Sequence, residues 1–146
     1  MPHTHPARPI NYLCICLVAI SLLVALPLKA QQTYWQGVAV EVISDLNDAQ
    51  SEYLDGDVAA AQSSLISSYF GHFEGQKMEA AMRMELGAKH TYSVERMFGQ
   101  LRKQLKLEDN VLAIKVLVAS MAGALTADAI LLDDAGITAE VFRVNQ

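Results

Sequence analysis

The position of its prolines is the feature that most restricts how this chain can fold. All four prolines lie at or before position 27, so the rest of the chain contains no residue that lacks a backbone N–H. Apolar residues in this proline-free part recur at spacings of three and four, the period of an amphipathic helix. No run of alternating apolar and polar residues is bounded by turn residues, as a strand would require. The sequence therefore predicts an all-α bundle of four to five helices.

Turn residues and helix caps divide the proline-free part into five expected helices. The first is supported by apolar residues that share one helical face: Trp35, Val38, Val42, Leu46, Ala49 and Tyr53. The pair Asp55-Gly56 is expected to end this helix, and Asp57 to cap the second. The other expected boundaries are a third helix over Gln76–Leu86, a fourth capped by Ser93 and a fifth capped by Asp109 or Asn110.

The fifth segment, "VLAIKVLVASMAGALTADAILL", is apolar enough to raise the question of a membrane span. Lys115 and Asp128 interrupt it, and the uncharged stretch between them covers only Val116 to Ala127. A bilayer span needs about 20 apolar residues, so this stretch is too short. We therefore expect a mostly buried core helix.

The first thirty residues have the order of charge and hydropathy that is typical of an export signal. Arg8 precedes an apolar run from Tyr12 to Leu28, and Ala30 ends a cleavage site followed by polar residues. Leu28 and Lys29 are unusual at such a site, so an uncleaved N-terminal membrane anchor is the alternative. We expect a signal peptide over residues 1–30 and one periplasmic or otherwise extracytoplasmic helical domain over residues 31–146.

Charge and cysteine content exclude several classes of partner and site. Processing after Ala30 would remove Arg8 and Lys29 from the eleven basic residues and none of the sixteen acidic ones, leaving a formal net charge of −7. Nucleic acid binds most strongly to surfaces with concentrated positive charge, and this domain is negatively charged. We therefore expect no nucleic-acid partner. Both cysteines, Cys14 and Cys16, lie inside the signal, which leaves the exported domain without a disulfide or a thiolate ligand.

Motifs that carry catalysis are missing from the sequence. There is no glycine-rich phosphate loop, no G-x-S-x-G elbow, no H-E-x-x-H and no C-x-x-C pair. No serine is marked by its neighbours as a nucleophile. We therefore expect a protein that is not an enzyme.

The stretch "SSYFGHFEGQKMEAAM" holds the candidate ligands. The main candidates are the carboxylates of Glu74 and Glu79, and His72 and Met78 are weaker candidates. Carboxylate oxygens suit iron and other hard divalent cations. On one continuous helix the two glutamates would point about 140° apart. A helix break at Gly75 would let both face one pocket. The alternatives are that Glu79 pairs with Arg83, four positions later, on the surface, that Met78 fills the core, and that His72 only caps a helix end.

A family resemblance supports the metal hypothesis. The segments "YLDGDVAAAQSSLISSYFGHFEGQKMEAAM" and "SVERMFGQLRKQL" resemble the exported N-terminal domain of bacterial FTR1-type high-affinity iron permeases. The matching positions are Tyr53, Gly56, Asp57, Tyr69, Phe70, Phe73, Glu74, Met78, Glu79, Ala81, Phe98, Leu101 and Arg102. The resemblance implies an all-α extracytoplasmic domain associated with iron uptake. The chain lacks the family's R-E-x-x-E motifs on transmembrane helices, which implies the exported domain rather than the permease.

Two functional hypotheses follow for the chain as a whole. The first is a domain that captures or presents iron, or another divalent cation, to a membrane iron permease. The alternative is a metal-free helical interaction or assembly module in the periplasm, in which the fifth helix serves protein contacts. Self-association into a homo-oligomer is open under both hypotheses.

Overall fold

A computed structural model describes residues 33–142, and the expected export signal lies outside these residues. The described part contains five α-helices and no strand, which confirms the prediction of an all-α helical bundle. The α-helices are α2 (Tyr34–Leu54), α3 (Val58–Ile66), α4 (Met78–Glu85), α5 (Ala88–Gln104) and α6 (Val111–Asp134). A π-helical segment, η3 (Ser67–Phe73), continues α3, and a short 3-10 helix, η4 (Ala139–Phe142), follows α6.

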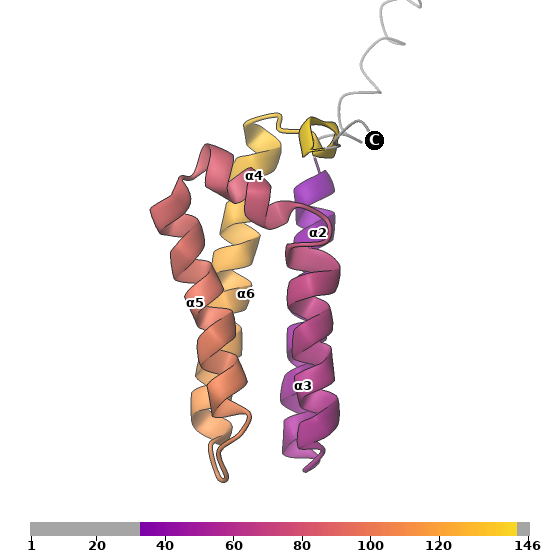
Figure 1. The fold of residues 1–146 in the computed structure, drawn as a ribbon, viewed down its shortest axis with the longest axis vertical. Helices are drawn as coiled ribbons and strands as arrows, with labels where there is room; N and C mark the ends of the chain where they lie inside the picture. Colours follow the sequence, from indigo (N-terminus) through magenta and orange to yellow (C-terminus); the bar gives the residue numbers. More distant parts are fainter. Residues whose placement is uncertain (1–32, 143–146) are drawn as a thin grey trace, which may run out of the picture.

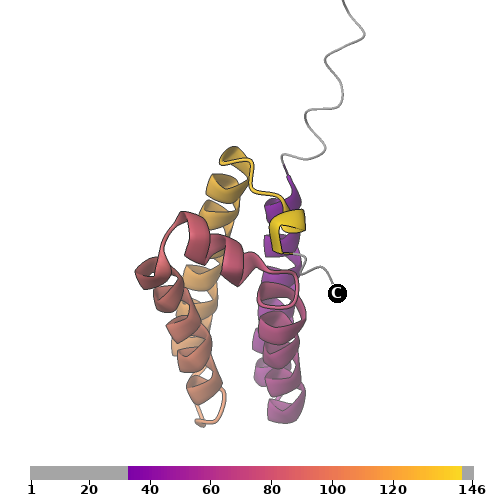
Figure 2. The same ribbon diagram turned by 45° about the horizontal axis from the view of Figure 1, so that its top comes forward.

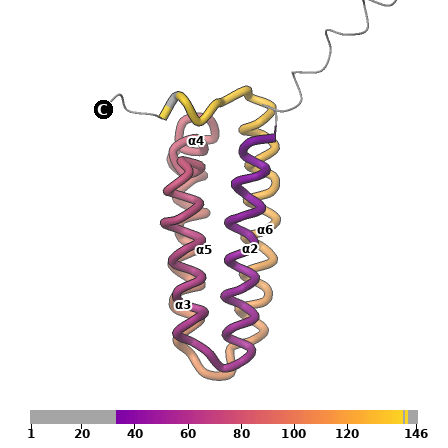
Figure 3. The backbone as a smooth tube through the Cα atoms, turned by 90° about the vertical axis from the view of Figure 1, so that its right-hand side faces the viewer, coloured from indigo at the N-terminus to yellow at the C-terminus, as the bar shows by residue number. Residues whose placement is uncertain are grey.

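The helices form an antiparallel bundle that is closed at one end by α4. Four long rods, namely α2, α3 with η3, α5 and α6, lie side by side and alternate in direction (Figures 1 and 3). The helix α2 packs against both α3 and α6, and α5 packs against α6. The short helix α4 crosses the end of the bundle between η3 and α5, as the tilted view in Figure 2 shows. This crossing carries the stretch in which the candidate ligands lie.

The core consists of the apolar stripes that the sequence predicts. All six members of the α2 stripe are buried, from Trp35 to Tyr53. The largest fully buried side chains on the other elements include Phe73, Met82, Leu101 and Met121. Each such side chain contributes about 1.5–3 kcal/mol through removal of apolar surface from water. The burial of these stripes is what holds the crossing segment in place.

The structure has the expected helix cap at Asp57 but not the one expected at Ser93. The Asp57 carboxylate accepts the backbone N–H of Ala60 at 2.9 Å, as an N-cap should. The expectation for Ser93 is wrong, because α5 begins earlier, at Ala88, and the Ser93 hydroxyl donates to the carbonyl of His90. Gly87 has a φ of 87°, a conformation that favours glycine, and it lets the chain turn directly from α4 into α5.

The helix α6 is less buried than the sequence suggests. Across an 18-residue stretch with a mean hydropathy of 1.7, only 33% of its residues are buried, so the expectation of a mostly buried helix is wrong. The reason is that α6 packs against its neighbours on one face, whereas its apolar composition continues around the other face. Among the described residues it is the one helix that is long and apolar enough to cross a membrane.

Candidate functional site

The expected helix break lies between residues 74 and 77. The backbone N–H of Glu74 donates to the carbonyl of Tyr69 at 2.8 Å, five residues earlier, and this bond closes the π-helical segment. Lys77 then adopts a left-handed conformation with a φ of 71°, and α4 begins at Met78. Glu74 therefore ends one helical segment and Glu79 lies in the first turn of the next, as the sequence predicts.

Gly75 is required at this break for a reason that the sequence does not reveal. A Cβ atom at this position would lie 2.4 Å from the carbonyl oxygen of Gly71 and 2.6 Å from that of Phe70. Both are backbone atoms, so no side-chain movement can relieve the clash. The left-handed residue of the turn is Lys77, and Gly75 instead lies close against the backbone carbonyls of the preceding helical turn.

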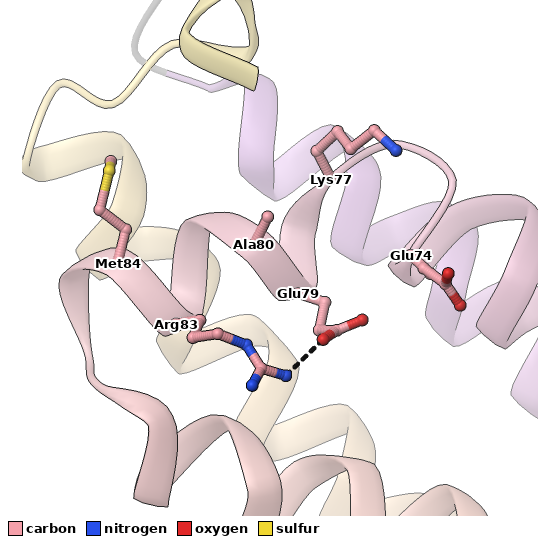
Figure 4. A pocket seen from close by; sticks show the side chains of 6 residues that line it. All are labelled: Glu74, Lys77, Glu79, Ala80, Arg83 and Met84. Carbon is pink, nitrogen blue, oxygen red and sulfur yellow. Dashed lines mark hydrogen bonds and ion pairs between the residues drawn. The ribbon is translucent and has the colours of Figure 1, made fainter. Parts of the chain in front are cut away.

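Glu74 and Glu79 line one pocket of about 350 Å³, together with Lys77, Ala80, Arg83 and Met84. Figure 4 shows the two carboxylates entering this pocket from different segments of the chain. The guanidinium of Arg83 lies beside the carboxylate of Glu79. His72 and Met78 do not line it. The structure thus brings together the two main predicted ligands and separates them from the two weaker ones.

Arg83 joins a third carboxylate to this pair. Its Nη2 atom lies 2.5 Å from Oε1 of Glu79 and 2.8 Å from Oε1 of Glu95, so one nitrogen bridges two acids. The Glu79 and Glu95 side chains retain only 19% and 21% of their exposure, whereas Arg83 is half exposed. The hydrogen bond from Arg83 to Glu79 raises the pKa of the guanidinium above its ordinary value. The sequence alternative of an ion pair between Glu79 and Arg83 is therefore present, as part of a larger cluster.

Electrostatics show that the acids share one environment. Burial, a hydrogen bond with Glu79 and the charge of Glu79 raise the pKa of the Glu95 carboxyl. Burial also raises the pKa of the Tyr69 hydroxyl, and the charges of Glu79, Glu95 and Glu74 raise it further. The Tyr69 ring packs edge-on against Phe98, with ring centroids 5.1 Å apart. We call Glu74, Glu79 and Glu95, with Arg83 and Tyr69, the acidic cluster.

The sequence interpretation missed Glu95, although a signal for it exists. Glu79 and Glu95 each lie eight positions from Gly87, on the two arms of the α4–α5 hairpin. The two arms meet at an angle, because α4 crosses the end of the bundle while α5 runs along it, and Arg83 on α4 reaches Glu95 on α5. Recognising Gly87 as a turn between two packed helices would have directed attention to the acidic residues of α5.

His72 and Met78 have other surroundings. Nδ1 of His72 lies 3.1 Å from Oε2 of Glu41, and its Nε2 lies 3.5 Å from Oδ2 of Asp45, both on α2. The imidazole therefore lies against α2 and is not part of the pocket that Glu74 and Glu79 line. Met78 is fully buried in the core, which matches the alternative given for it from the sequence.

Within residues 33–142, no group of three or more His, Cys, Asp or Glu side chains is already arranged to hold a metal ion. In the acidic cluster a guanidinium lies where a cation between Glu79 and Glu95 would be. The arrangement is therefore a set of carboxylates around a positively charged side chain. Comparison with known proteins adds nothing to this geometry, since no family model, curated protein or solved structure matches the chain.

Proposed function

We propose that this chain is a non-enzymatic extracytoplasmic domain that captures iron, or another hard divalent cation, at the acidic cluster and presents it to a membrane iron permease. The bridge that Arg83 makes between Glu79 and Glu95 carries the proposal. Two partly buried carboxylates held 2.5 and 2.8 Å from one cationic nitrogen define a position that favours positive charge.

The chemistry of the donors supports a hard cation. Carboxylate oxygens prefer iron, manganese, magnesium and calcium to softer ions such as copper(I). Glu74 lines the same pocket and would provide a further oxygen. Because the Arg83 side chain is half exposed, it can move into solvent when a metal takes its place.

Export and the permease partner rest on the sequence. The apolar run from Tyr12 to Leu28 supports export, and the resemblance to permease N-terminal domains supports the partner. The break between Glu74 and Glu79, which the resemblance implies to be functional, supports the same proposal through its geometry.

Metal titration tests the proposal directly. Manganese(II) or iron(II), the latter without oxygen, should bind the purified chain in calorimetry, and the Glu74→Gln, Glu79→Gln double variant should bind at least tenfold more weakly. Glu85→Gln is the matched control, because Glu85 is an exposed glutamate on α4 outside the pocket. Unchanged affinity of the double variant, or no binding by the parent at millimolar metal, would reject the proposal.

A second candidate function, a metal-free assembly module, is favoured by the exposed apolar face of α6. Leu112 and Val116 on this helix retain 76% and 58% of their exposure. Large apolar surfaces of this kind commonly mark sites of protein contact. The two functions use different parts of the molecule and are compatible with one another.

A further inference from the structure

The exposed face of α6 has a size pattern that is the same in both chain directions. The small residues Ala119 and Ala127 each lie four residues from Gly123, one on either side. The β-branched residues Val116 and Ile130 each lie seven residues from it, again one on either side. Spacings of three and four place all five on one side of the helix, and all five are exposed. A second copy of α6 in the opposite direction would thus set small residues against small ones and large against large.

Gly123 lies at the centre of this pattern and is open to solvent. A Cβ atom at this position would have nothing within 4 Å, so the fold itself does not require glycine there. Glycine in the middle of a helix is less favourable than alanine because it loses more conformational freedom on folding. Small residues on an exposed helical face allow a second helix to approach closely, and Gly123 lies between two further small residues on this face.

Charge selects the direction of pairing. Of the charged residues on α6, Asp128 and Asp133 are buried, which leaves Lys115 and Asp134 exposed at opposite ends. Parallel pairing would set like charges side by side. In antiparallel pairing about Gly123, Lys115 of one copy lies at the height of residue 131 of the other, within one helical turn of its Asp134.

We infer that this chain forms an antiparallel homodimer through the exposed face of α6, with Gly123 at the crossing point on the two-fold axis. Such an interface is isologous, since the same surface is used by both copies. It covers the apolar side chains that the bundle leaves in water, among them Leu112 and Val116. The inference does not depend on cation binding at the acidic cluster, which lies on η3, α4 and α5.

Sedimentation with a chelator present tests the dimer apart from metal. The chain purified from an exporting host should show a concentration-dependent monomer–dimer equilibrium. Gly123→Leu should weaken association at least tenfold while circular dichroism shows the helices intact. Gly99→Leu is the matched control, because Gly99 is a helical glycine on α5 that also has nothing within 4 Å of its Cβ position, and it should leave association unchanged.

The charge pair tests the direction. Lys115→Glu and Asp134→Lys should each weaken association severalfold, and the two together should restore it, since the pair is then reversed. A monomer at every concentration up to millimolar, or a double variant that associates no better than the single ones, would overturn the inference. Monomers that sediment with phosphatidylcholine vesicles, equally for all these variants, would also overturn it and identify a bilayer as the occupant of this face.

Discussion

The carboxylate of Asp133 accepts a hydrogen bond of 2.9 Å from the backbone N–H of Trp35, across a separation of 98 positions in the chain. Its second oxygen accepts the backbone N–H of Gln36 at 3.1 Å. The last turn of α6 thus supplies the missing cap of α2, whose own N-cap residue, Thr33, makes no side-chain hydrogen bond. The indole N–H of Trp35 donates to the carbonyl of Ile137 at 2.7 Å and fastens the same end.

Removing this shared cap should destabilise the whole bundle. Asp133→Ala leaves the backbone N–H groups of Trp35 and Gln36 without their acceptor, which should lower the free energy of unfolding by about 1–3 kcal/mol. Urea denaturation followed by circular dichroism measures the change. Asp48→Asn is the control, because Asp48 is exposed on α2, and its effect should stay within about 0.5 kcal/mol. Equal effects of the two substitutions would show that the cap does not contribute.

Alanine at Gly75 should disturb the break between the two glutamates. The added Cβ meets backbone oxygens of Gly71 and Phe70, so the connection must shift at a cost of about 1–3 kcal/mol. Gly99→Ala adds the same atom in open space within α5 and should stabilise the chain by about 0.5–1 kcal/mol. Thermal unfolding of both variants should show shifts of opposite sign. A Gly75→Ala variant as stable as the parent would contradict the close approach.

Protonation of the Glu95 carboxylate should stabilise the fold as the pH falls. Its folded-state pKa is raised by burial and by Glu79, so the folded chain binds this proton more tightly than the unfolded chain does. The resulting stability is fully present below the ordinary pKa of 4.5 and is lost as the pH rises through the raised value. Relative to Glu95→Gln, the parent should therefore gain stability as the pH is lowered from 7 towards that value. Carboxyl chemical shifts in NMR should show the raised pKa directly, and an ordinary titration of Glu95 would contradict it.

If Arg83 occupies the position of the cation, removing its charge should strengthen metal binding. Arg83→Gln eliminates a group that must leave Glu79 and Glu95 before a metal can bridge them, so manganese affinity should rise severalfold. Glu95→Gln should weaken binding, because its carboxylate is one of the two that Arg83 bridges. Arg96→Gln, an exposed substitution on α5, is the control for net charge. Identical effects of the two arginine substitutions would place the metal elsewhere.

The sequence was sufficient for features that depend on neighbouring residues. The apolar stripe of α2, the Asp57 cap and the break around Gly75 each follow from spacings of a few positions, and the structure contains all three. The break matters most, because it places Glu74 and Glu79 in one pocket.

Features that depend on distant residues were missed. The Asp133 cap requires knowing that the two ends of the described chain meet, and Glu95 requires knowing that α4 and α5 form a hairpin about Gly87. The exposure of α6 was missed for a related reason. Composition shows that a helix is apolar, whereas only the number of neighbouring helices decides how many of its faces are covered.

The π-helical segment Ser67–Phe73, next to the acidic cluster, contains more residues per turn than an α-helix does. A turn closed from residue i to i+5 holds about one residue more than an α-helical turn, so η3 contains roughly one residue beyond what an α-helix would need. Losing one residue in α3 would rotate all that follows by about 100°. Losing one within η3 can instead be absorbed by straightening into an α-helix, with Glu74 left near its present direction. Chain length and site geometry are thus uncoupled at this one segment.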